Sequence, residues 1–144
     1  MAYKSHVLVV ANLTAASDEL LGAMAARAQR TPARFTMIVP VTGTNTAVRA
    51  TARGRLDEAL EGARAAGLEA DGALGDCDPV VAVTEAFDPR HHDEIMVSTL
   101  PTGASHWMRA DLPQRIGRIT GAPVVHVISR DLPVAAPRAS AGLR

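Results

Sequence analysis

The chain has 144 residues, 47% hydrophobic and 21% charged, which is the composition of one globular domain and not of a disordered chain. Fifteen basic and fifteen acidic residues give zero formal net charge, so we expect no nucleic-acid or membrane partner to be attracted by an overall field. The apolar runs are too short to span a bilayer, no signal-peptide pattern begins the chain, and the single cysteine excludes an internal disulfide, which together predict a cytoplasmic protein.

The first half of the chain alternates between strand and helix patterns. A continuous β-branched and aliphatic run at residues 6–11 predicts a strand buried on both faces. Ser17 predicts the N-cap of a helix that runs to about Arg30. Residues 35–39 predict a second buried strand closed by a proline, and apolar residues at helical spacing then predict a long helix that ends at Gly67.

The second half continues this alternation. Residues 68–74 alternate in polarity and predict a third strand at an edge of the sheet, and Asp78 with Pro79 predicts the start of a short helix. Residues 95–97 predict a fourth strand, and apolar residues at helical spacing predict a fourth helix, before a fifth strand at residues 124–128; the apolar positions of that helix are Leu112, Ile116 and Ile119.

Strands that alternate with helices predict an α/β fold with a five-stranded, parallel, doubly wound sheet in the order 3-2-1-4-5 and helices on both faces. We expect a single domain over residues 1–128. Residues 129–144 contain prolines and small residues without periodicity, which predicts a mobile C-terminal tail.

In such a sheet, ligands bind beyond the carboxyl ends of the strands, where the chain order reverses between strands one and four. The hydroxyls of Ser98, Thr99 and Thr102 could hold a phosphate or a carboxylate there, or bond to one another. The predicted ligand-binding residues are those that this topology brings to that edge: Asn12, Leu13, Val39, Pro40, Gly75, Asp76, Ser98, Thr99, Leu100, Thr102, Gly103 and Asp111.

Three segments resemble the universal stress protein family, and the resemblance covers nearly all of residues 4–128. Residues 75–79 and 92–97 are similar to the family's glycine-led turn, third helix and acid-then-apolar strand, and residues 120–127 are similar to its small-Pro-Val strand entry. The resemblance implies the adenine nucleotide alpha hydrolase-like fold and a role in stress response.

The family's ATP-binding branch follows strand four with Gly-x-x-Gly, nine residues and Gly-Ser or Gly-Thr, and these glycines let backbone amides approach the phosphates. Here Ser98 and Pro101 stand at the first two glycine positions and Ala110-Asp111 at the last pair. Proline donates no N–H, and a carboxylate about 4 Å from a phosphate charge is repelled by roughly 4 kcal/mol at an effective dielectric of about 20. The family's acidic residue after strand one is replaced by Asn12. We therefore expect weak or absent ATP binding.

Other features of the sequence indicate no catalytic or metal-binding residues. Trp107 either stacks on a planar ligand or closes the top of the core. Residues 91–94 carry metal-ligating types, but adjacent residues entering a strand point to alternate sides, which favours a solvated turn. Acidic neighbours oppose a thiolate at Cys77, and the chain has no Gly-x-Ser-x-Gly or Gly-x-Gly-x-x-Gly motif.

The sequence therefore predicts a non-enzymatic, universal-stress-protein-like module that binds a partner or small ligand and needs no cofactor. We expect a homodimer that pairs through the apolar fifth strand, made of Val124, Val125, His126, Val127 and Ile128.

An alternative is an ATP- or AMP-binding protein or weak nucleotide hydrolase. In that alternative Ser98, Thr99, Thr102 and Gly103 hold the phosphates, and Asp111 holds Mg²⁺. A third alternative is a redox switch at Cys77.

Overall fold

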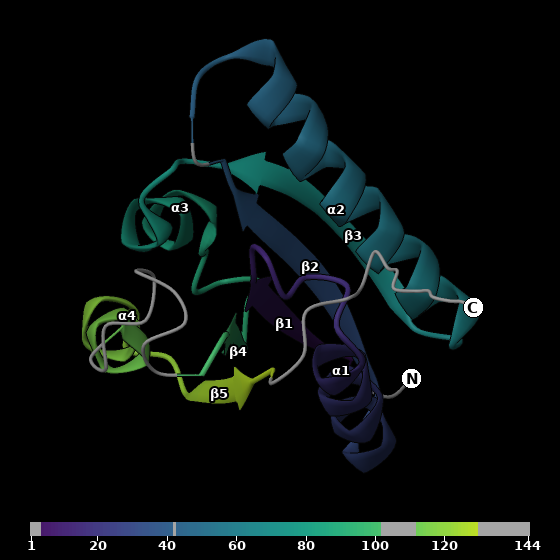
Figure 1. Cartoon of the computed structure of the whole chain (residues 1–144). Coiled ribbons are helices and arrows are strands. Elements are labelled where there is room, and N and C mark those ends of the chain that lie inside the picture. The colour runs from purple at the N-terminus through teal and green to yellow at the C-terminus, as the bar shows by residue number, and fades with distance from the viewer. Residues whose placement is uncertain (1–3, 42, 102–111, 130–144) are drawn as a thin grey trace.

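The computed structural model describes residues 4–41, 43–101 and 112–129. The predicted tail over residues 129–144 lies outside this part of the chain except for Ser129. Within the described residues, strands and helices alternate as the sequence predicts (Figure 1): β1 (Ser5–Val10), α1 (Asp18–Arg30), β2 (Ala33–Pro40), α2 (Thr46–Ala65), β3 (Glu69–Gly75), α3 (Pro79–Ala86), β4 (Glu94–Thr99), α4 (Leu112–Thr120) and β5 (Val124–Ile128).

The strands form one parallel sheet in the order β3-β2-β1-β4-β5, which confirms the predicted topology. Right-handed crossovers that run first toward β3 and then toward β5 place α1 and α2 on one face and α3 and α4 on the other (Figure 1). Alternate residues of β1 point to opposite faces of the sheet. Val7 and Val9 pack with α1 and α2, whereas Leu8 and Val10 pack with α3 and α4.

The helices begin at side-chain caps. The Ser17 hydroxyl accepts a hydrogen bond from the Leu20 amide at 3.1 Å, and the Asp78 carboxylate accepts one from the Val80 amide at 2.9 Å. Each of these bonds satisfies one of the amides that the first turn of a helix leaves unpaired. Both caps confirm the predicted helix starts.

Gly72 lets α2 pack closely against the sheet. A Cβ at this position would lie 2.4 Å from the Met37 carbonyl oxygen and 2.8 Å from the Leu56 Cδ1 atom. The lack of a side chain at Gly72 therefore allows the short distance between α2 and the β2-β3 pair.

The fourth strand is longer than predicted. It runs to Thr99, whereas the apolar pattern indicated residues 95–97. The extension arises because β5 continues to pair beyond the apolar run, with Ser98 opposite Val127 and Thr99 opposite Ile128. Ser98 and Thr99 therefore belong to the end of a strand and not to the loop that follows it.

Two histidines pack together near the amino end of the sheet. The Thr36 hydroxyl donates its proton to Asp71, so the Thr36 oxygen accepts a hydrogen bond from Nε2 of His6. The buried Nδ1 of His6 has no hydrogen-bond partner among the described residues. The ring of His92 lies 4.5 Å from that of His6 and stacks on Phe87. The predicted solvated turn is therefore wrong for His92, which is half-buried.

Stability should fall on acidification because of this pair. Burial lowers the pKa of both His6 and His92 from 6.5, and Arg34 adds to the effect. The folded protein keeps the rings neutral while the unfolded chain takes up protons below about pH 6.5, so stability present above that pH is lost as the pH falls. Urea denaturation between pH 8 and pH 5 measures this loss.

The variant His92→Asn retains an acceptor for the Asp88 amide and should show a weaker pH dependence than the wild type. His91→Asn, which removes the neighbouring exposed ring, is the matched control and should change the pH dependence less than His92→Asn does. A free energy of unfolding that rises below pH 6.5 would contradict the assignment.

Candidate functional site

The switch point of this sheet lies where β1 and β4 end side by side and their following helices leave to opposite faces. We define the switch-point site as the residues at the carboxyl ends of β1, β2, β3 and β4. Of the predicted ligand-binding set, Thr102, Gly103 and Asp111 lie outside the described residues, as does Trp107. The structure brings the other predicted residues to the expected edge of the sheet.

A chain of buried hydroxyl groups occupies the switch-point site. The oxygens of Thr14 and Ser98 lie 2.6 Å apart, those of Ser17 and Ser129 lie 2.7 Å apart, and those of Ser98 and Ser129 lie 3.5 Å apart. All four residues are at most 2% exposed. This hydroxyl network joins the loop after β1 to the ends of β4 and β5. For Ser98 it corresponds to the second of the two alternatives in the sequence analysis, in which the hydroxyls bond to one another.

Thr99 faces the other side of the same strand end. Its hydroxyl is hydrogen bonded to Nε2 of His126 at 2.7 Å, and Thr99 itself is 1% exposed. The second predicted phosphate-binding hydroxyl is thus also engaged with a protein group. The roles of Ser98 and Thr99 in ligand binding remain predictions.

Asn12 and Arg55 form a polar contact that sequence reasoning missed. Asn12 is buried directly after β1, and its Oδ1 accepts a hydrogen bond from Nη1 of Arg55 on α2 at 3.1 Å. No carboxylate of a described residue lies within 4 Å of the half-buried Arg55. The sequence did contain one indication that Arg55 is partly buried, because Arg55 directly precedes Leu56 and so borders the buried face of α2.

The ends of β2 and β3 close the neighbouring side of the site. Val39 and Pro40 are buried, and the backbone at Gly75 approaches α3 so closely that a Cβ would lie 3.0 Å from the Ala82 side chain. The Asp76 carboxylate accepts a hydrogen bond from the Asp78 amide at 2.9 Å, which orders the turn before α3. Leu13, in contrast, is exposed.

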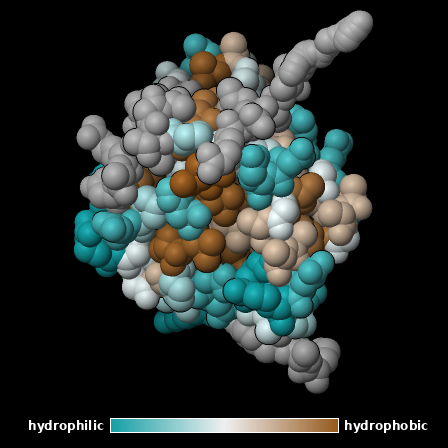
Figure 2. All heavy atoms as spheres, turned by 60° about the horizontal axis from the view of Figure 1, so that its bottom comes forward, coloured by the Kyte–Doolittle hydropathy of each residue, from teal (hydrophilic) through white to brown (hydrophobic). Residues whose placement is uncertain are grey.

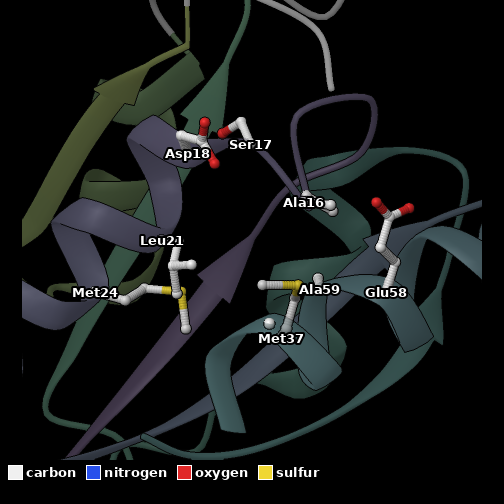
Figure 3. Close-up of a pocket in the computed structure, with 10 residues that line it drawn as sticks. Ala16, Ser17, Asp18, Leu21, Met24, Met37, Glu58 and Ala59 are labelled. Carbon is white, nitrogen blue, oxygen red and sulfur yellow. The ribbon is translucent and has the colours of Figure 1, made fainter. Parts of the chain in front are cut away.

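A cavity of about 200 Å³ lies between α1 and α2, beside the loop that follows β1 (Figure 3). Its lining includes none of the predicted ligand-binding residues that the structure describes, and no pattern in the sequence indicated this cavity. Its lining comes from four consecutive residues that lead into α1, two further positions on α1, one on β2 and three on α2: Ala15, Ala16, Ser17, Asp18, Leu21, Met24, Met37, Glu58, Ala59 and Gly62.

The described residues contain no group of three or more histidine, cysteine, aspartate or glutamate side chains placed to hold a metal ion. No helix within these residues combines the length and the hydropathy that crossing a membrane requires.

The hydroxyl network should contribute measurably to stability. Ser98→Ala leaves the buried Thr14 hydroxyl without its partner, and Thr14→Val leaves that of Ser98, so each change should lower the free energy of unfolding by about 1–2 kcal/mol. The double variant should lose about 0.5–1.5 kcal/mol less than the sum of the single losses. Urea denaturation of the three variants measures the coupling, and strictly additive losses would show that the two hydroxyls do not interact.

A comparison of the sequence with the profiles of known protein families found no match, and neither did a comparison with curated proteins. Solved structures do match. The universal stress protein from Archaeoglobus fulgidus is 14% identical with a TM-score of 0.65, covering 85% of this chain and 93% of its own.

The structure of the A. fulgidus protein in complex with dAMP is 16% identical, with a TM-score of 0.63 and coverage of 88% and 99% of the two chains. A universal stress protein in complex with cAMP is 19% identical, with a TM-score of 0.60 and coverage of 88% and 98%. These similarities confirm the fold that the resemblance in sequence implied: the chain has the α/β fold of the universal stress proteins.

Proposed function

We propose that this chain is a non-enzymatic binding module of the universal stress protein type, which takes a small ligand with a single anionic group, such as a nucleoside monophosphate, at the switch-point site and holds ATP weakly or not at all. The observation that carries this proposal is the hydroxyl network. In this network the hydroxyl groups that are best placed to bind phosphates are hydrogen bonded to each other instead.

Opening the network to bind a polyphosphate is costly. Each hydroxyl group has a single proton to donate, and Thr14, Ser17, Ser98 and Ser129 are all buried. If the hydroxyl that donates within a pair turned toward a phosphate, its partner's oxygen would lose that hydrogen bond in the interior, at a cost of about 1–3 kcal/mol. The network therefore favours a ligand that needs no phosphate cradle at the end of β4.

Arg55 offers a different group for an anion. The guanidinium donates one hydrogen bond to the neutral side chain of Asn12, and no carboxylate among the described residues neutralises it. A guanidinium has five N–H donors in a planar fork that matches a phosphate or a carboxylate. One such group suits a single anionic substituent, and the complexes of similar structures with dAMP and cAMP contain ligands of that kind.

The proposal that the chain is non-enzymatic is supported by the limited access to its hydroxyl groups. A nucleophilic hydroxyl needs both a base and an open approach to its substrate. Among the described residues of the switch-point site, Thr99 has a histidine partner, but its own side chain is almost completely buried. The geometry therefore supports binding without covalent chemistry.

We also propose that the protein forms a homodimer through β5. This strand is at the edge of the sheet, so one row of its backbone groups faces away from β4. Val125 is 41% exposed and Ile128 is 44% exposed. Figure 2 views the molecule from the side where β5 lies in Figure 1, and it shows hydrophobic side chains gathered within a hydrophilic border. A second β5 would cover such an edge.

Calorimetry with AMP, ADP and ATP, with and without Mg²⁺, tests the ligand proposal. We expect AMP to bind at least about tenfold more tightly than ATP, a difference of about 1.4 kcal/mol, with no nucleotide hydrolysed. Arg55→Gln should weaken AMP binding, whereas Arg53→Gln removes the same charge from an exposed position of α2 and should not. Submicromolar affinity for ATP would overturn the proposal and favour the nucleotide-hydrolase alternative.

Light scattering of the purified protein at micromolar concentration tests the dimer. The wild type should have the mass of two chains, and Val125→Lys should have the mass of one, because it places a charge on the paired edge. Val81→Lys changes a residue of α3 with a similar exposure of 38% and should remain dimeric. A wild-type monomer would refute pairing through β5.

A further inference from the structure

The cavity between α1 and α2 has an apolar floor. Leu21 and Met24 of α1, Met37 of β2 and Ala59 of α2 line it, and Figure 3 shows the two methionines between the helices. Methionine side chains are flexible and polarisable, so such a floor adapts to short alkyl groups. The volume of about 200 Å³ is below the roughly 300–1,000 Å³ of sites for drug-sized ligands, which makes the cavity too small for a nucleotide.

Two carboxylates border this apolar floor. Asp18 begins α1 and Glu58 lies on α2, so they approach the cavity from opposite helices (Figure 3). Both residues are exposed, and neither forms a hydrogen bond or an ion pair with another described residue. The cavity thus has two carboxylates at its border that no described residue neutralises.

The cationic side chains near the cavity are engaged elsewhere. Arg55 lies one helical turn before Glu58, but its guanidinium donates to Asn12. Arg27 lies one turn after Met24, and its guanidinium is paired with Glu94 at 2.9 Å. The Ser17 hydroxyl at the rim is bonded to Ser129 and to the Leu20 amide. Neither of these two arginines therefore pairs with Asp18 or Glu58, and both carboxylates stay open to a cationic ligand as far as the described residues are concerned.

We propose that the cavity between α1 and α2 binds a small organic cation, a primary ammonium on a short apolar chain. The chain fills the space over Met24 and Met37, and the ammonium group lies between the carboxylates of Asp18 and Glu58. The cavity shares Ser17 with the hydroxyl network of the switch-point site, but the proposal does not depend on the function proposed there. Opposite charge gives the site its specificity, and the buried apolar chain gives it contact area.

Methionine methyl NMR tests the proposal with the full-length protein and three probes of equal chain length. We expect n-butylammonium to shift the methyl signals of Met24 and Met37, with affinity on the order of millimolar for so small a ligand, and to leave that of Met96 unmoved because Met96 does not line the cavity. The neutral 1-butanol and the anionic butyrate should bind at least about fivefold more weakly.

Asp18→Asn and Glu58→Gln should each weaken n-butylammonium about three- to fivefold. Glu61→Gln removes a charge from an exposed position of α2 outside the cavity and should have no effect. Equal binding of the three probes, equal effects of Glu58→Gln and Glu61→Gln, or an unchanged Met24 signal would overturn the proposal. Binding that appears only after residues 130–144 are deleted would also overturn it, by making the chain's own C-terminal residues the occupant.

Discussion

Four buried hydroxyl groups connect segments that are far apart in the chain. Ser17 both caps α1 and bonds to Ser129, and Ser98 at the end of β4 contacts both Ser129 and Thr14. A buried hydroxyl must be hydrogen bonded, so the position of each one restricts the others. The loop after β1, the end of β4 and the residue after β5 are therefore held as one unit, and the chemistry of the switch-point site follows from this constraint.

The fold alone does not decide which ligand binds at the switch-point site. A doubly wound sheet places loops around a switch point whatever their sequence, but what binds there depends on the groups that the loops present. Here the strand-end hydroxyls face inward, and the cation next to Asn12 comes from the body of α2. The chain has the fold of the universal stress proteins, and in our proposal the polar groups at the carboxyl edge of its sheet suit a single anion better than a polyphosphate.

Local patterns made the strands, helices and caps predictable, because each depends on residues close in sequence. The sheet order was predictable from the crossover rules for parallel strands. The bond between Ser17 and Ser129 joins residues 112 positions apart, and no spacing rule indicates it. Arg55 was missed for the same reason, since its partner lies on another element. The cavity depends on how far α1 stands from α2, a distance set by side-chain packing and by the close approach at Gly72.

The central claim is that the hydroxyl network keeps the end of β4 closed to polyphosphate. A crystal structure of the protein grown with excess ATP and Mg²⁺ tests it most directly. The account predicts that Ser98 remains hydrogen bonded to Thr14 and that no triphosphate is ordered against the end of β4. A triphosphate bound there, with the hydroxyls of Ser98 and Thr99 turned onto its oxygens, would contradict the account.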